Sequence, residues 1–251
     1  MPVSDKYYEF SSRDGMKISG LASFANNSKI VLIFPGLTGQ PQHYMFLKFR
    51  DELIKNGYDV FITHPYSSEE KNNHQPRALA NITTQRHIDD IEDVINHFSK
   101  KYEQVYATGH SLSGRMLLFA NTDKLSKQAL VDPSSGFDND KARERMTDYY
   151  KTNLDGKHYI DWEDGLTYAV GPLVDEFMSV TSQSIISAVD KLKVETLFIK
   201  AGDTVIALPY KFHMTPKTRF VEVPNAAHTF WQHGTAEQAI KEIINFFRQG
   251  I

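Results

Sequence analysis

The sequence predicts an α/β fold: a mostly parallel, doubly wound sheet with an antiparallel N-terminal start and a small helical cap insertion. Two β-branched and aromatic runs, at residues 6–12 and 16–23, follow each other at hairpin spacing. Later short apolar runs alternate with segments of helical periodicity, as in repeated β-α units. One stretch, residues 134–190, interrupts this alternation. We expect a single domain, 1–251, that carries 134–190 as a cap or lid.

The later strand candidates are short runs rich in β-branched and aromatic residues, the composition of a buried strand. They are residues 29–34, 58–63, 104–108, 128–131, 195–200 and 218–223. Helical periodicity is clearest from about residue 84 to residue 98, where four apolar side chains recur on one stripe. Residues 46–55 and 236–247 have the same spacing, and Gly57 predicts the end of the first of these helices.

The interrupting stretch contains charged segments with helical character at residues 140–151 and 171–189. An aromatic-rich link, residues 159–168, joins them. Because this stretch follows a sheet strand and precedes another, we expect it to cover one end of the sheet.

Composition excludes several classes of function. The chain is 41% hydrophobic and 24% charged, which is typical of a globular protein. It has no cysteine, so disulfides, thiolate metal sites and a cysteine nucleophile are excluded. The formal charge of −3 gives no electrostatic reason to expect nucleic acid as a partner. No run approaches the length of a membrane span or a signal-peptide core, so we expect a cytoplasmic protein.

A candidate nucleophile lies where the strand 104–108 runs through Gly109 into a helical segment. Ser111 occupies the turn between them. A serine on such a tight turn requires very small residues two positions before and after it, because the backbones pass close together. Gly109 supplies the first, and Ser113, with Gly114 behind it, supplies the second. This is the G-x-S-x-G nucleophile elbow with Ser113 in place of its second glycine.

With this elbow, the chain from residue 29 to the last helix resembles the α/β-hydrolase superfamily. The segment P-G-L-T-G at residues 35–39 resembles the H-G-x-x-G loop of that superfamily, with Pro35 in place of histidine. The elbow S-L-S-G-R at residues 111–115 is also similar to that of the bacterial acyltransferases and thioesterases of bioluminescence. Similarity to monoacylglycerol-lipase-like and serine aminopeptidase-like hydrolases is comparable.

The resemblance implies a histidine base and two oxyanion donors. The superfamily places its base after the last strand, and His228 follows the strand 218–223 and precedes the final helix. His233 is the alternative base. The backbone N–H of Leu112, at a helix N-terminus, and that of Leu37, in the 35–39 loop, would hold a developing oxyanion.

Two carboxylates are candidates for the acid that orients the base. After the strand 195–200, the sequence A-G-D-T-V-I-A-L-P resembles the G-x-x-D-x-x-V-P of the superfamily. An ungapped match puts Val205 at the acid position, whereas a loop two residues longer puts Asp203 there. Asp132, at the end of the strand 128–131, is the alternative, at a position that some members use. Asp203 is preferred because Asp203-Thr204-Val205 is also similar to the acid segment of the bioluminescence enzymes.

Together these residues predict a serine hydrolase that cleaves acyl esters or thioesters through a Ser-His-Asp triad and an acyl-enzyme. The expected partner is a small-molecule acyl substrate, and aromatic residues in the cap would cover its acyl group. No metal or organic cofactor is expected, because a serine, a base and fixed donors suffice for acyl transfer. The alternative is a non-catalytic protein of the same fold that binds a small ligand or a partner.

One further pattern is set aside. His87, Asp90, Asp93 and His97 line one stripe of the helix predicted at 84–98 and could in principle form a metal site. They also border the apolar face of a helix that must present polar residues to water, and we interpret them in that way.

Overall fold

The structure is a computed structural model that describes residues 5–37, 39–64, 66, 79–136, 150–152, 158–161, 167–170, 172–202 and 214–249. The strands of its main sheet are β1 (Lys6–Ser11), β2 (Lys17–Ser23), β3 (Lys29–Phe34), β4 (Asp59–Thr63), β5 (Gln104–His110), β6 (Lys127–Val131), β10 (Glu195–Ala201) and β11 (Thr218–Val223). The helices are α1 (Tyr44–Lys55), η1 (Leu79–Asn81), α2 (Thr84–Phe98), α3 (Ser111–Phe119), α5 (Leu173–Ser179), α6 (Ser182–Asp190) and α7 (Thr235–Arg248).

The main sheet confirms the predicted mixed topology. Within the described residues it has eight strands in the order β1-β2-β4-β3-β5-β6-β10-β11. β1 pairs with β2 and β2 pairs with β4 in antiparallel register. All other neighbours are parallel. The carboxyl ends of the parallel strands therefore lie at one edge of the sheet, where ligands bind in open α/β folds.

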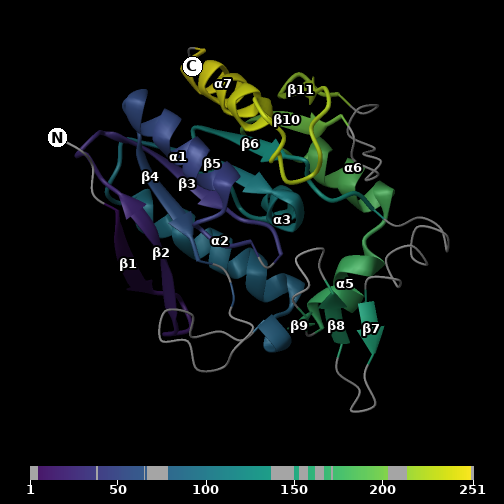
Figure 1. Cartoon of the computed structure of the whole chain (residues 1–251). Helices are drawn as coiled ribbons and strands as arrows, with labels where there is room; N and C mark the ends of the chain where they lie inside the picture. The colour runs from purple at the N-terminus through teal and green to yellow at the C-terminus, as the bar shows by residue number, and fades with distance from the viewer. Residues whose placement is uncertain are drawn as a thin grey trace.

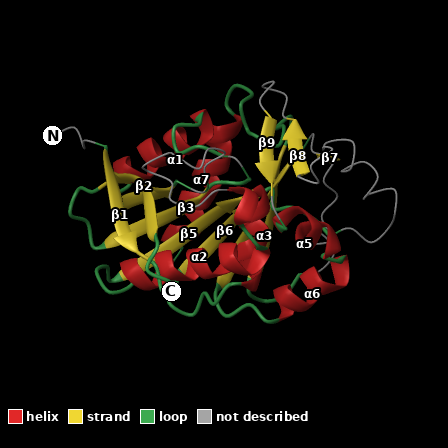
Figure 2. Ribbon diagram, turned by 90° about the horizontal axis from the view of Figure 1, so that it is seen from below, coloured by secondary structure: helices red, strands yellow, loops and turns green. Residues whose placement is uncertain are grey.

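Helices cover both faces of this sheet, as a doubly wound fold requires (Figures 1 and 2). α1 and α7 pack on one face, where Leu53 and Ile243 join a buried cluster with Val31 of β3. α2 and α3 pack on the other, where Ile91 and Leu117 belong to a second cluster. β3 is buried on both faces, which explains its unbroken apolar sequence.

α2 begins and ends where its apolar periodicity predicts. Thr83 is its N-cap, and the Thr83 side chain accepts a hydrogen bond of 3.0 Å from the N–H of Arg86. Such a cap satisfies one of the unpaired N–H groups of the first turn. Among the described residues, no helix is both long enough and apolar enough to cross a membrane.

The insertion between β6 and β10 differs from the helical expectation in part. β7 (Tyr150–Thr152), β8 (His158–Asp161) and β9 (Thr167–Val170) form a separate antiparallel sheet where an aromatic-rich link was expected. This sheet lies beside α5 and away from the main sheet (Figure 1). Alternating aromatic and β-branched residues, as in His158-Tyr-Ile-Asp, favour strands over helix. Most of the helix expected at 140–151 lies outside the described residues.

The helix expected at 171–189 is divided into α5 and α6. Thr181 breaks it, because its side chain caps α6 by accepting a hydrogen bond from the N–H of Ser184. A threonine whose oxygen caps a new helix favours a boundary at that point over a continuous helix. The chain thus returns to the main sheet through two short helices.

Candidate active site

Ser111 lies at a strained turn between β5 and α3. Its φ is 53°, in the left-handed region that non-glycine residues rarely adopt. The close approach at this turn is between Gly109 and Gly114: a Cβ on Gly109 would lie 2.9 Å from the Gly114 Cα. A Cβ on Gly114 would lie 2.8 Å from the Gly109 oxygen. The second small residue is therefore Gly114, so position 113 is free to carry a side chain.

His228 lies against Ser111. The Nε2 of His228 is 2.8 Å from the Ser111 Oγ, and the loop that carries His228 follows β11 as the sequence predicts. His110 holds this loop, because its Nε2–H donates a 2.8 Å hydrogen bond to the backbone oxygen of His228. The two imidazole rings are 4.7 Å apart. His233, the alternative base, is exposed at the turn before α7.

Asp132 is the carboxylate that contacts the base. Its Oδ2 is 2.5 Å from the Nδ1 of His228, and its side chain is fully buried. The other oxygen, Oδ1, accepts a 3.1 Å hydrogen bond from the N–H of Ala201 on β10. Asp132 has φ 42°, and its own N–H donates to the Ile199 oxygen at 2.6 Å. Because a carboxylate only accepts, Nδ1 of His228 carries the proton and Nε2 is left to accept from Ser111.

The sequence ranking of the two acids is therefore not the one that the geometry favours. Asp132, ranked second, occupies the position beside Nδ1 of His228. Asp203, ranked first, lies outside the described residues. The sequence favours Asp203 because a loop motif follows β10. The only sequence signal for Asp132 is its position directly after β6. Parallel pairing of β6 with both β5 and β10 brings that place next to the elbow.

The two predicted oxyanion donors belong to segments that adjoin Ser111. Leu112 is the second residue of α3, so its N–H is among those without a partner inside the helix. Leu37 follows Gly36, which packs directly on the elbow: a Cβ on Gly36 would lie 2.9 Å from the Ser111 Cβ. Only a glycine allows the 35–39 loop to approach the nucleophile this closely.

Two neighbours of Ser111 and His228 were not predicted from the sequence. Ser134 donates its N–H to the Ser111 oxygen at 3.1 Å, and its Oγ is 3.5 Å from the Ser111 Oγ. His110, which holds the His228 loop, is buried beside a second imidazole, so its pKa lies well below the ordinary histidine value. His110 directly precedes Ser111 and Ser134 lies two residues after Asp132, which was the available signal.

Arg115 joins the elbow helix to the insertion. It is fully buried, its guanidinium lies 3.8 Å from the centre of the Phe177 ring, and it donates to the Ser135 and Phe177 oxygens. Phe177 is one of the cap aromatics that are expected to cover an acyl group, and its ring packs against Arg115. The other cap aromatics expected there have side chains outside the described part. They are Tyr149, Tyr150, Tyr159, Trp162 and Tyr168.

The stripe of acidic and histidine residues on α2 does not converge on one point. His97 bonds the Tyr8 hydroxyl at 2.8 Å, Asp93 pairs with Arg13, and His87 bonds Ser113. Within the described residues no cluster of three or more histidine and carboxylate side chains has the geometry of a metal site. Asp90 accepts a 3.0 Å hydrogen bond from the Tyr66 hydroxyl and, like Asp93, pairs with Arg86.

Comparison of the fold with solved structures identifies its class, whereas no protein-family model matches the sequence. The α/β hydrolase GrgF from Penicillium sp. sh18 superposes with a TM-score of 0.70 at 16% identity, covering 98% of this chain and 99% of that one. The chain has the α/β-hydrolase fold. The esterase Pf2001 from Pyrococcus furiosus matches this chain with a TM-score of 0.70 at 15% identity, covering 98% of this chain and 91% of that one.

Est1E from Butyrivibrio proteoclasticus, in a structure with bound ferulic acid, matches with a TM-score of 0.66 at 16% identity and covers 97% and 94%. These identities are low, so the likeness establishes the α/β-hydrolase fold and leaves the chemistry to be argued from the site.

Proposed function

We propose that this α/β-hydrolase protein is a serine hydrolase that cleaves acyl esters or thioesters. The observation that carries the proposal is the continuous contact Ser111 Oγ to His228 Nε2 and His228 Nδ1 to Asp132, with distances of 2.8 and 2.5 Å. A nucleophile, a base and an orienting acid in this order are the requirements for covalent acyl transfer.

In the proposed reaction, His228 removes the proton of Ser111 as its Oγ attacks the acyl carbonyl. Asp132 keeps the imidazole in the tautomer that accepts at Nε2 and stabilises the imidazolium that forms. The N–H groups of Leu37 and Leu112 hold the oxyanion, and each such donor typically contributes about 3 kcal/mol to transition-state stabilisation. The protonated His228 then gives its proton to the leaving group, and water hydrolyses the acyl-enzyme.

The substrate class is argued from the site. Esters and thioesters come first because Ser111, His228 and two backbone donors are sufficient for both, and no residue described near Ser111 marks a pocket for a free amino terminus. The esterase names of the neighbours Pf2001 and Est1E favour esters over thioesters. The acyl chain would be covered by the cap insertion, residues 134–190.

A kinetic panel tests this proposal. The purified protein is assayed with p-nitrophenyl esters of increasing chain length and, in parallel, with acyl-CoA thioesters of the same chains. We expect saturable hydrolysis of at least one series, abolished in Ser111→Ala. Background rates throughout both series would instead favour the non-catalytic binding protein.

A further inference from the structure

Ser113 is the position at which this chain departs from the glycine of the elbow pattern. It is buried, with 1% of its surface exposed, and it is two residues from the proposed nucleophile. Because Gly109 and Gly114 make the close approach at the turn, a side chain at position 113 needs no backbone adjustment there. The hydroxyl group that stands at this position is therefore available for a role of its own.

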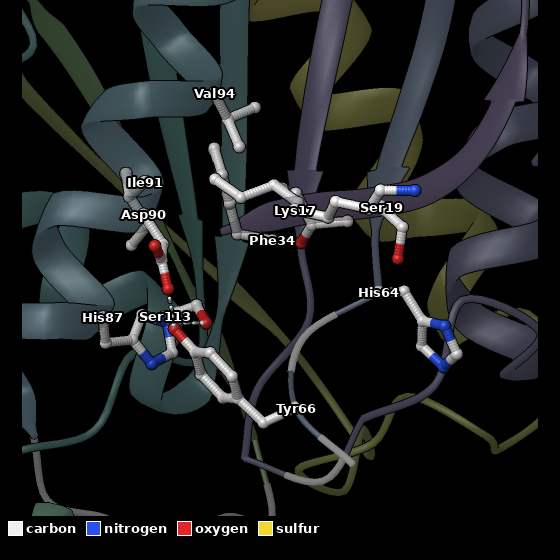
Figure 3. Close-up of a pocket in the computed structure, with 12 residues that line it drawn as sticks. Lys17, Ser19, Phe34, His64, Tyr66, His87, Asp90, Ile91, Val94 and Ser113 are labelled. Atoms are coloured by element: carbon white, nitrogen blue, oxygen red, sulfur yellow. Dashed lines mark hydrogen bonds between the residues drawn. The ribbon is translucent and has the colours of Figure 1, made fainter. Parts of the chain in front are cut away.

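The Ser113 hydroxyl links two elements that are far apart in sequence. Its Oγ donates a hydrogen bond to the Pro35 oxygen, and the His87 Nε2 lies 3.0 Å from the same Oγ. Figure 3 shows the His87 ring, from α2, directed at Ser113. Both side chains line a cavity of about 40 Å³ behind the elbow, together with Phe34 and Ile91.

The direction of each hydrogen bond follows from the chemistry of the groups. A carbonyl oxygen only accepts, so the Ser113 proton is directed to Pro35. Ser113 Oγ must then accept from His87, which fixes the proton of the neutral imidazole on Nε2. The His87 Nδ1 is buried and has no hydrogen-bond partner among the residues that the structure describes, as an unprotonated nitrogen in an apolar site would have none. Burial lowers the pKa of His87 to about 4, so the ring remains neutral near pH 7.

The carbonyl that Ser113 holds belongs to the loop that carries a proposed oxyanion donor. Pro35 and Gly36 share one rigid peptide plane, and Leu37 provides the next N–H along the chain. A hydrogen bond from the Gly39 N–H to the Gly36 oxygen, 3.0 Å long, closes the loop on its other side. Fixing the Pro35 carbonyl therefore anchors the start of this loop, and the hydrogen bond to the Gly36 oxygen restrains the peptide plane that carries the Leu37 N–H.

We propose that Ser113 and His87 are positioning residues that hold the loop 35–39 in the orientation needed for oxyanion binding. The role of Leu37 rests on the proposed function. The restraint on the loop does not rest on the proposed function, because the hydrogen bonds that make it belong to the fold. In this protein a hydroxyl–imidazole pair thus couples α2 to the oxyanion loop through the elbow.

Four variants test the proposal. Ser113→Ala removes the hydroxyl that joins His87 to the Pro35 oxygen, and His87→Leu removes the donor to that hydroxyl. His87→Gln retains an N–H donor near Nε2. The fourth, Ser23→Ala, is a matched control, because it removes a buried hydroxyl of β2, away from the elbow, that donates to Asp5 at 2.5 Å. Circular dichroism and thermal melting establish that each variant is folded. Ester hydrolysis and hydrogen exchange of the peptide covering residues 35–40 are then measured.

We expect Ser113→Ala and His87→Leu to lower kcat by about 10- to 100-fold with KM changed by less than about threefold, since losing an oxyanion donor outright costs about 10²- to 10³-fold in kcat. Exchange of residues 35–40 accelerates in both variants. His87→Gln returns kcat to within about threefold of the wild type, and Ser23→Ala changes neither quantity, because its bond is distant from the loop.

Wild-type kcat together with unchanged exchange in Ser113→Ala would overturn the proposal, as would a loss confined to KM. If the wild-type protein hydrolyses none of the esters, the proposed function fails. The exchange measurement still decides whether Ser113 and His87 restrain the loop. The two failures are therefore distinguishable.

Discussion

At the scale of single residues, the site depends on two residues whose backbone is in the left-handed conformation. Ser111 has φ 53° and Asp132 has φ 42°. Such conformations cost of order 1–3 kcal/mol each and persist only where the surroundings impose them. Here the Ser134 N–H holds the Ser111 oxygen, and the Ile199 oxygen holds the Asp132 N–H. Both strained residues lie at the carboxyl ends of parallel strands. Hydrogen bonds with neighbouring strands and loops fix their backbone conformation there.

The identity of the acid is tested by a matched pair of isosteric substitutions. Asp132→Asn removes the charge that accepts from His228 Nδ1–H and favours the wrong tautomer of the ring. We expect kcat to fall by about 10³- to 10⁴-fold, as for the acid of other triads. Asp203→Asn is expected to leave kcat within about threefold of the wild type. A large loss in Asp203→Asn with little change in Asp132→Asn would restore the ranking that the sequence motif favours.

At the scale of elements, the end of α7 is held by a buried lysine on β6. The side chain of Lys127 is only 2% exposed, and its Nζ donates to the Phe246 and Gln249 oxygens at 3.2 and 2.6 Å while pairing with Glu195 at 2.9 Å. A cation is favourable at the carboxyl end of a helix, where carbonyls lack partners. The last helix, which follows the loop of the base, is thereby attached to the central sheet.

Lys127→Met retains the length of the side chain but leaves these carbonyls without a donor. We expect the free energy of unfolding to fall by about 2–3 kcal/mol, the cost of unsatisfied buried polar groups. Lys124→Met, at an exposed lysine three residues before the start of the same strand, is the control and should change stability by less than about 0.5 kcal/mol. Urea denaturation gives both values, and equal midpoints for the two variants would contradict this role for Lys127.

Elements with strong local signals were predictable, and those that depend on distant contacts were not. The apolar stripe placed α2 from the sequence alone, and the cap at Thr83 is a finding of the structure. The elbow was found because glycine and serine on a strand-to-helix turn have few alternative uses. The contact of Asp132 with His228 was not predictable, because the two residues are 96 positions apart and only the sheet order brings them together. The interaction of His87 with Ser113 has no sequence signal at all, since its direction depends on how α2 packs.

At the scale of the whole molecule, a buried neutral histidine makes stability depend on pH. Burial lowers the pKa of His87 from 6.5 to about 4. The Tyr66 ring and Asp90 face the same cavity, and the Ser113 hydroxyl is its hydrogen-bond partner. Near pH 7 the ring is neutral in both states. As the pH falls below 6.5, the unfolded chain binds a proton that the folded protein does not, so stability decreases until the pH reaches about 4.

The expected loss from this residue is about 3 kcal/mol between pH 7 and pH 4, from about 1.4 kcal/mol for each pKa unit. His87→Gln should flatten the pH dependence of the unfolding free energy by that amount, measured by urea denaturation at several pH values. His233→Gln, at an exposed position, should leave the curve unchanged. A His87→Gln curve parallel to that of the wild type would contradict the buried, neutral state of the ring.

Intact-protein mass spectrometry after treatment with a fluorophosphonate probe tests most directly whether Ser111 is an activated nucleophile. With no cysteine in the chain, no thiol competes for the reagent. The proposed mechanism predicts a single adduct on the folded wild-type protein, mapped to Ser111 by peptide sequencing, and none on Ser111→Ala. Absence of the adduct from the wild type, or equal labelling of Ser111→Ala, would contradict it.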